Sequence, residues 1–404
     1  MAGGHGHLDD AALLTRPTAE IGRLSGKVQM LAVVGLVLAA IGFFVAGDAF
    51  WQSYLIAYIF WIGLTLGSMA VLMVQYLSGG AWGLVARRVL EAAARNLPVM
   101  AVAFVPIWLK RTSLYPWARP EAATDEIIHQ KAAYLNVPFF TVRAVLMFAV
   151  WGTLIYLLTK WSKDQDDLPA QPPGPADARF RVLSGPGLVL YVITITFMSV
   201  DWIMSLDPHW YSTIFGILTL GGQGLSTMAF TILILALLVE FEPMRHVADA
   251  EKFHDIGKLM FAFTLLWAYF SVSQLLIIWS ANLPEEIPFY LERLHGPWYP
   301  VSLAVLLGQF VLPFIFLLSR DLKRNPRTVK WIALWVLFFR IVDITWTIGP
   351  VFRHEGSSIS WVDFAAVLGM GGVWLWFFFR NLADRALVPA KDPYFKEAMA
   401  HGGH

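Results

Sequence analysis

The 404-residue sequence contains no cysteine. This absence excludes disulfide bonds, cysteine-ligated iron–sulfur clusters, c-type haem attachment and thiol catalysis within the chain. Histidine is scarce as well, because there are only ten and none falls in the middle of an apolar run. A b-type haem takes its axial ligands from buried helix faces, so we expect this chain to bind no haem, and we identify no metal site.

The sequence also contains few charged residues. Charged residues make up 15% of the chain and hydrophobic residues 57%, whereas about a quarter of an ordinary soluble domain is charged. The net charge of +1 gives no reason to expect a nucleic-acid partner. The N-terminal stretch is polar and lacks the apolar core of a cleavable signal peptide, so we expect none.

Long apolar runs are what the sequence does contain. Runs of about 20 residues recur, and each is long enough to cross a hydrocarbon core of about 30 Å as an α-helix. The sequence therefore predicts an all-α polytopic membrane protein with ten transmembrane helices. The predicted spans are residues 28–47, 51–78, 90–110, 138–160, 182–206, 211–240, 257–281, 297–319, 330–352 and 359–381.

The third span is the weakest of the ten. Its continuous apolar part, Leu97 to Leu109, has only 13 residues, so the span must include the preceding amphipathic stretch "VLEAAARN". The basic residues support it, since 22 of the 30 Lys and Arg lie on the N-terminal side of the predicted membrane, 6 on the opposite side and 2 within spans. Omitting the span would invert every later loop and destroy this bias. By the positive-inside rule we expect both termini in the cytoplasm of a bacterial inner membrane protein.

An internal repeat divides the chain. The stretch from Trp51 aligns with the stretch from Trp210 at an offset of 159 residues, with six identities in twenty positions. Spans 2 and 6 are four helices apart and hence parallel, so we expect two similar four-helix bundles, spans 2–5 and spans 6–9, with spans 1 and 10 peripheral. The regions are a tail at 1–27, spans 1–5 at 28–206, spans 6–10 at 207–381 and a second tail at 382–404.

Two carboxylates and a histidine lie in "SVDWIMSLDPHWYST", the stretch that joins spans 5 and 6. Asp201 in span 5 and Arg143 in span 4 each lie about five residues, or roughly 8 Å, below the same membrane face. An ionisable group inside a bilayer costs about 2.5–3.5 kcal/mol and usually has a partner, so we predict an Arg143–Asp201 pair. Asp207, Pro208 and His209 then form the exit turn. The pair is either a clamp between helices or part of a proton exit.

Further polar residues lie inside the later spans. Arg340 and Asp343 are three residues apart in span 9, close enough to share a helix face near mid-membrane, where neither would stay charged alone. They form either a structural clamp or a functional pair. Gln223, Gln274 and Gln309 lie in spans 6, 7 and 8, where we expect interhelical hydrogen bonds, with a ligand contact as the alternative.

The polar residues spread in depth across the membrane. Glu240 and Glu242 end span 6, either as solvated helix ends or as points of proton uptake. The candidate proton pathway comprises Asp201, His209, Arg143, Arg340, Asp343, Gln274, Gln309, Glu240 and Glu242. A second group clusters in the outer loops by topology alone, as a docking rim for a partner protein or as ordinary solvated loops. Its members are Glu285, Glu286, His295, Arg353 and His354.

The ten-span plan, the doubled bundle and above all "SVDWIMSLDPHWYSTIFGILTLGGQG" resemble the NrfD-like membrane subunits of polysulfide reductase and its relatives. Within that superfamily the chain is similar to the ActF-type subunit of alternative complex III, a quinol:cytochrome c oxidoreductase, and the ActC-type subunit shares the motif. The resemblance covers most of the chain, and its specific part is the motif from Asp201 to Trp210. It implies a structural, energy-coupling subunit that can conduct protons and has no redox centre of its own.

The resemblance also implies partners. These are an ActC-like membrane subunit, periplasmic iron–sulfur and multihaem cytochrome c subunits, lipid, and a terminal oxidase as a further partner. In the family, quinol is oxidised near the outer face of the ActC-type subunit. The present chain has no in-span histidine on that side as a base for quinol, which counts against a quinone site here. Two alternatives stay open, a quinone-binding NrfD-like subunit of ActC type or of another reductase, and a secondary transporter.

Overall fold

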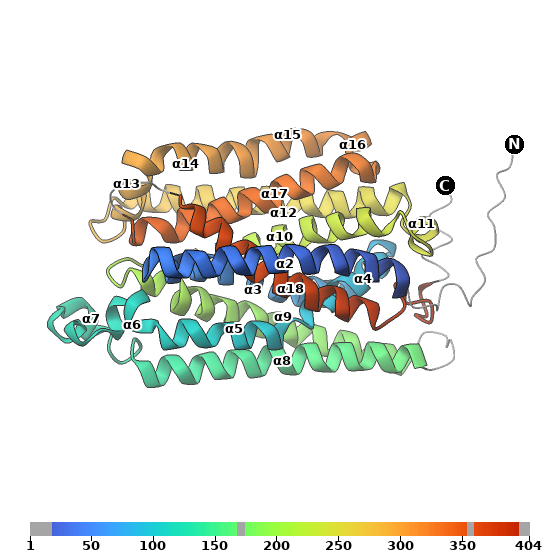
Figure 1. Cartoon of the computed structure of the whole chain (residues 1–404), viewed down its shortest axis with the longest axis horizontal. Helices are drawn as coiled ribbons and strands as arrows, with labels where there is room; N and C mark the ends of the chain where they lie inside the picture. The colour runs from blue at the N-terminus through green and yellow to red at the C-terminus, as the bar shows by residue number, and fades with distance from the viewer. Residues whose placement is uncertain (1–17, 168–173, 354–358, 396–404) are drawn as a thin grey trace, which may run out of the picture.

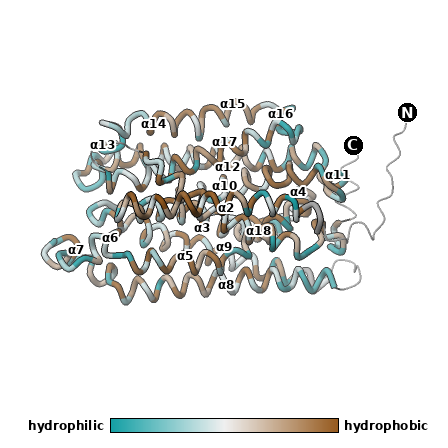
Figure 2. Tube along the Cα trace, in the orientation of Figure 1, coloured by the Kyte–Doolittle hydropathy of each residue, from teal (hydrophilic) through white to brown (hydrophobic). Residues whose placement is uncertain are grey.

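In the part of the chain that the structure describes, ten long apolar helices run side by side along the long axis of the molecule (Figure 1). The computed structural model describes residues 18–167, 174–353 and 359–395, and in these ranges the chain forms helices and turns without a β-strand. Hydrophobic residues occupy the middle of the bundle and hydrophilic residues gather toward its two ends (Figure 2), as a lipid bilayer requires. The predicted all-α, multi-pass membrane architecture is confirmed.

Each predicted span corresponds to one continuous helix or to one interrupted helix. The spans are α2 (Thr18–Ala46), α3 (Ala49–Ser78), α4 with α5 (Ala81–Ala94 and Leu97–Leu109), α8 (Val137–Asp167), α9 (Pro175–Trp202), α10 (Phe215–Leu238), α12 (Ala250–Ala281), α14 with η5 and α15 (Tyr299–Val305, Leu306–Val311 and Leu312–Leu318), α17 (Pro326–Ile348) and α18 (Trp361–Ala383). The weak third span is thus present, and its amphipathic lead-in is α4.

Short helices lie at both ends of the bundle (Figure 1). One end, called the α7 end, carries α6 (Arg111–Leu114), α7 (Glu126–Gln130) and α13 (Pro288–Leu294). The opposite end, called the α11 end, carries α11 (Met244–Val247) and α16 (Arg320–Arg324).

Some helices begin earlier than predicted because polar residues cap them. α12 begins at Ala250 instead of residue 257, since the Asp249 carboxylate accepts hydrogen bonds from the backbone amides of Glu251 and Lys252. Such a cap satisfies backbone donors that have no partner within the helix. The helix therefore extends beyond its apolar part.

The two helices related by the repeat, α3 and α10, pack against each other, and both are buried along most of their length. They approach closely at Gly67, where a Cβ atom would lie 2.3 Å from Thr227 Oγ1, so only a residue without a side chain fits. Around this pair, α3 packs against α4, α5 and α9, while α10 packs against α12 and α17. The spans from α3 to α9 and from α10 to α17 form two helix groups, and α9 joins them because it packs against both α3 and α10.

The first and last spans differ in how deeply they are buried in the helix bundle. α2 lies on the outside, with most of its apolar surface exposed to the membrane. α18 packs against α2, α3 and α4. Its Trp374 is fully buried, and the Trp61 indole of α3 donates to the Val367 carbonyl at 3.0 Å. α18 is thus more deeply buried than α2, because it packs aromatic side chains against α3.

Candidate functional site

The predicted Arg143–Asp201 pair is present near the α7 end. Arg143 Nε lies 2.7 Å from Asp201 Oδ2 and Nη2 lies 3.0 Å from Oδ1, so the contact is bidentate. Arg143 also donates to the Tyr134 carbonyl at 3.0 Å, and its guanidinium carbon lies 3.8 Å from the centre of the Tyr134 ring. Asp201 is fully buried. The pair therefore joins α8 to α9 through buried, mutually neutralising charges.

A cavity of about 400 Å³ lies beside this pair at the α7 end. Tyr134 and Ser205 line the cavity, and both contact the pair, since Ser205 Oγ donates to the Asp201 carbonyl at 2.6 Å. Burial raises the pKa of Tyr134, and the nearby Asp201 carboxylate raises it further, so this phenol stays protonated at neutral pH. A protonated phenol thus lines the cavity close to the buried ion pair.

The turn formed by Asp207, Pro208 and His209 borders this cavity. His209 is exposed, and its Nε2 lies 2.9 Å from Asp125 Oδ2. Lys131 Nζ donates to the Pro208 carbonyl at 2.6 Å. Backbone amides of α7, and then His209, hold the pKa of the Asp125 carboxyl below its ordinary value. The turn therefore meets water, as predicted, and is attached to the segment that carries α7.

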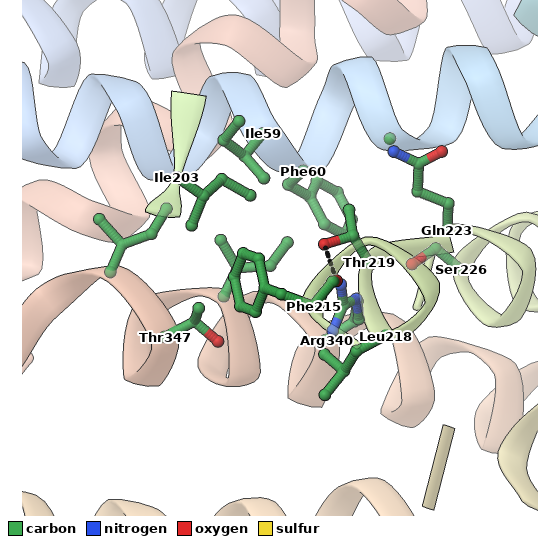
Figure 3. A pocket seen from close by; sticks show the side chains of 13 residues that line it. Ile59, Phe60, Ile203, Phe215, Leu218, Thr219, Gln223, Ser226, Arg340 and Thr347 are labelled. Atoms are coloured by element: carbon green, nitrogen blue, oxygen red, sulfur yellow. Dashed lines mark hydrogen bonds between the residues drawn. The ribbon is translucent and has the colours of Figure 1, made fainter. Parts of the chain in front are cut away.

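The second predicted pair is formed on α17. Arg340 Nη1 donates to Asp343 Oδ2, and both side chains are buried. Arg340 faces a cavity of about 20 Å³ between α3, α10 and α17, which has room for about one water molecule (Figure 3). Four further polar side chains line it, namely Thr219, Gln223, Ser226 and Thr347.

This central cavity also connects the two helix groups. Tyr191 of α9 donates to Gln223 Oε1 at 2.8 Å, which confirms an interhelical hydrogen bond for that glutamine. Ile203, two residues beyond Asp201, lines the cavity as well. Asp343 lies five residues before the end of α17, about 8 Å of helix rise. Asp343 thus lies in the half of α17 that is nearer to the α7 end.

Gly222 of α10 makes room for Arg340. A Cβ atom at this position would lie 2.2 Å from Arg340 Nη2 and 2.3 Å from its Cζ. We expect Gly222→Ala to displace the guanidinium from Asp343 and to lower the free energy of unfolding by about 1–3 kcal/mol. Denaturant-induced unfolding in mild detergent measures this change.

The repeat supplies the matched control for that substitution. Gly63 occupies the equivalent position in α3, where a Cβ atom would meet only Gln223 Cγ, at 3.5 Å. This is an ordinary van der Waals distance, so Gly63→Ala should be close to neutral. Equal stability of the two variants would contradict a tight contact between Gly222 and Arg340.

Gln274 and Gln309 are both buried. Gln309 lies in η5, a π-helical turn, and neither its amide oxygen nor its nitrogen has a hydrogen-bond partner among the described residues. The expected interhelical bond of Gln309 is therefore not formed. Gln274 lies next to the Tyr290 hydroxyl, at the α7 end of α12. π-helical turns recur at functional sites, so Gln309 stays a candidate for the pathway.

Glu240 and Glu242 lie beyond the end of α10. α10 ends at Leu238, and both glutamates are exposed in the following turn. Glu242 Oε1 lies 3.2 Å from His246 Nε2. Leu238, the last residue of α10, is roughly 22 Å of helix rise away from Gln223, which lines the central cavity. This placement agrees with solvated helix ends and excludes direct proton transfer from these residues to Asp343.

Arg353 does not belong to an exposed docking rim, and that prediction is corrected. Its guanidinium donates to both carboxylate oxygens of Asp363, at 2.8 and 2.7 Å, and lies 3.3 Å from Ser53 Oγ. Asp363 is buried in the first turn of α18, where a carboxylate needs a counter-charge. Arg353 therefore joins α18 to α3.

The other members of the predicted rim have mixed exposure. Glu285 and His295 are exposed at the α7 end, and Glu286 is half-buried. His295 Nδ1 lies 2.9 Å from the Leu291 carbonyl. His354 lies outside the described residues. The rim is thus reduced to the loop around α13.

A charged network at the α11 end was not predicted from the sequence. Arg88 of α4 donates to Glu91 at 2.8 Å, to Ser162 at 2.9 Å and to Asp166 at 2.5 Å. Arg385, after α18, donates to the same Glu91 carboxylate at 3.1 Å. The only local signal was the three-residue spacing of Arg88 and Glu91 on an amphipathic helix, which also fits an exposed pair. The network joins α4, α8 and the segment after α18.

Arg293 of α13 is a second buried cation that the sequence did not reveal. It donates to the carbonyls of Trp346 and Thr347 at 3.2 and 2.7 Å, and its guanidinium carbon lies 3.5 Å from the Phe289 ring centre. Burial lowers the pKa of Arg293 to about 9, so it remains a cation at neutral pH. Arg293 thus satisfies carbonyls in the last turn of α17.

Within the part of the chain that the structure describes, no group of three or more His, Asp or Glu side chains is arranged to hold a metal ion. No known protein family matches the chain, and no curated protein matches it either. The structure itself shows a multi-pass helical membrane protein. A buried arginine–aspartate pair lies in each of its two helix groups.

Proposed function

We propose that this chain is a membrane subunit of a respiratory quinol:cytochrome c oxidoreductase of the alternative complex III type. It has no redox centre of its own and conducts protons. The proposal rests on two buried ion pairs, Arg143–Asp201 and Arg340–Asp343, one in each helix group. A small cavity, which Arg340 and four other polar side chains help to line, lies where the groups meet. Ionisable residues inside a membrane are costly and mark proton or ion pathways.

The Arg340–Asp343 pair can exist in two states. When Asp343 takes up a proton, its charge is lost and the attraction to Arg340 ends. The guanidinium then turns to the hydroxyls of Thr219 and Thr347, which line the same cavity. Return of the guanidinium restores the ion pair and expels the proton. The pair therefore acts as a switch between a loaded and an empty carboxylate.

The Arg143–Asp201 pair forms the exit toward the α7 end. Asp201 releases its proton past the Tyr134 phenol into the adjoining cavity of about 400 Å³. His209 at the border of this cavity, with Asp125 at 2.9 Å, passes the proton to bulk water. A histidine suits this step because its two ring nitrogens can accept a proton on one side and donate one on the other.

A seam of buried hydroxyls favours an uptake route between α3 and α10. Thr227 and Thr231 lie one turn apart on α10, and Ser68 lies on α3, all fully buried and without hydrogen-bond partners in the described chain. Gln75, further along α3, packs against Gly83 of α4, the helix that carries the charged network of the α11 end. This route replaces Glu240 and Glu242 in the proposed pathway.

In the proposed orientation the α11 end faces the cytoplasm of a bacterial cell and the α7 end faces the periplasm. The bias of 22 against 6 Lys and Arg supports it. The exposed loop around α13 then faces the periplasmic iron–sulfur and cytochrome subunits. The central cavity of about 20 Å³ has no room for a quinone headgroup or a transported solute.

Co-purification tests the proposed function. An affinity-tagged chain isolated from native membranes in mild detergent should bring down a second multi-pass subunit together with iron–sulfur and multihaem cytochrome c proteins. Separation of the subunits should leave this chain without haem absorption. A chain that purifies alone, or one that keeps stoichiometric b-type haem, would refute the proposal.

A further inference from the structure

An apolar groove opens to the membrane on a side of the molecule that the proposed proton pathway does not use. Its volume is about 760 Å³, within the range of roughly 300–1,000 Å³ of sites that hold small molecules. α2, α3, α5 and α18 form its walls. Phe44 and Val102 at its edges are 83% and 72% exposed, so the groove is accessible from the lipid.

The groove offers hydrocarbon contact and almost no polar contact. Two lining residues carry a polar side-chain hydrogen, and both are already used. The Tyr54 hydroxyl donates to the Ala103 carbonyl at 2.8 Å, and the Trp374 indole donates to Thr65 Oγ1 at 2.9 Å. Its occupant must therefore be apolar over the length of the groove.

A cation lies at the α7 end of this groove. Lys110 directly follows α5, and its Nζ lies 5.5 Å from the centre of the Trp51 ring. The Trp51 ring contacts three groove-lining rings, those of Phe43, Phe50 and Tyr54, at centroid distances of 5.9, 5.6 and 5.7 Å. In the described chain Lys110 forms no ion pair. Its ammonium group is thus available to an anion at the membrane surface.

We infer that the groove binds one anionic phospholipid, with an acyl chain between α2, α5 and α18 and the phosphate beside Lys110. The dimensions agree, since the rise of α5 from Pro98 to Lys110 is about 18 Å. One leaflet of a bilayer with a hydrocarbon core of about 30 Å is about 15 Å thick. The lysine at the end of the groove can pair with a lipid phosphate, and the apolar groove can hold an acyl chain. An apolar transmembrane helix of a partner would leave the charge of the lysine without a counter-charge.

Native mass spectrometry of the detergent-purified protein, exchanged into mixtures of phosphatidylglycerol and phosphatidylcholine, tests this site. We expect one phosphatidylglycerol to stay bound. Lys110→Ala should weaken its retention about fivefold, which corresponds to about 1 kcal/mol for one lysine at a phosphate. Ala40→Trp, which fills the groove from α2 and leaves the lysine in place, should abolish it.

The control is Lys330→Ala, because Lys330 lies 5.9 Å from the Trp331 ring centre, at the α11 end of α17 and away from the groove. It should keep the lipid. Retention of the lipid in Ala40→Trp, or equal loss in Lys330→Ala and Lys110→Ala, would overturn the assignment.

Photo-crosslinking provides a measurement that does not depend on a folded variant. Phosphatidylglycerol with a photoreactive acyl chain should label residues 36–44, 98–106 and 366–377 of the unaltered protein. Excess unlabelled phosphatidylglycerol should suppress this labelling and leave that of the membrane-facing surfaces of α8 and α12 unchanged. Uniform labelling that does not respond to competition, or no labelling of the groove because a partner protein covers it, would refute the lipid site.

Discussion

Asp201→Ala is expected to lower the free energy of unfolding by about 3–5 kcal/mol, whereas Arg143→Met combined with Asp201→Leu should restore most of that loss. The reason is that both guanidinium bonds of the bidentate contact, at 2.7 and 3.0 Å, end on a fully buried carboxylate. Removing the carboxylate alone leaves a buried, uncompensated cation. Removing both charges leaves an apolar contact between α8 and α9, which suits a membrane interior.

Denaturant titration in lipid–detergent bicelles measures these differences. Asp384→Ala is the control, because the Arg95–Asp384 contact at 3.2 Å is partly exposed and such pairs contribute about 0–1 kcal/mol. If the double substitution is as unstable as Asp201→Ala, the pair does more than neutralise charge, and the two side chains are needed for their shape or their hydrogen bonds. If Asp201→Ala matches Asp384→Ala, the buried pair is not important for stability.

The features that the sequence predicted follow from rules that act locally or along one helix. Span length and loop charge identified ten helices, including the short third span. Depth below the membrane face is set by helix rise, so counting residues placed Arg143 opposite Asp201 before any packing was known. The three-residue spacing of Arg340 and Asp343 identified a shared face in the same way.

The features that escaped prediction join residues far apart in the chain. Arg353 was assigned to a solvent-exposed rim because its partner Asp363 lies ten residues further along the chain, at the start of the next helix, and the sequence does not define how the two approach each other. Glu91 meets Arg385, nearly 300 residues away, only because α4 is buried beside the segment after α18. The relation of α18 to α3 likewise depends on packing between aromatic rings, which hydrophobic patterns do not specify. Partners of buried charges thus need the tertiary structure.

Asp343→Asn is expected to leave quinol oxidation largely intact and to lower the number of protons moved per electron. Asparagine keeps the shape of the side chain and can still accept a hydrogen bond from Arg340, but it carries no titratable proton. In vesicles reconstituted with the complete complex, the ratio should fall toward the value for protons released by quinol oxidation alone. Electron transfer should change little, since the redox centres of the proposed complex belong to other subunits. Asp384→Asn, at a partly exposed carboxylate, is the matched control.

Asp201→Asn should behave differently, because Asp201 not only releases the exiting proton in the proposed pathway but also holds Arg143 between α8 and α9. Asp201 holds Arg143 through two bonds inside the bundle, so loss of its charge should reduce assembly of the complex. Asp343 belongs to a pair that borders a cavity of about 20 Å³, where the guanidinium has hydroxyls as alternative partners. Its variant should assemble and lose coupling. If both variants assemble and both keep the parent ratio of protons to electrons, neither pair carries protons and the chain acts as a scaffold.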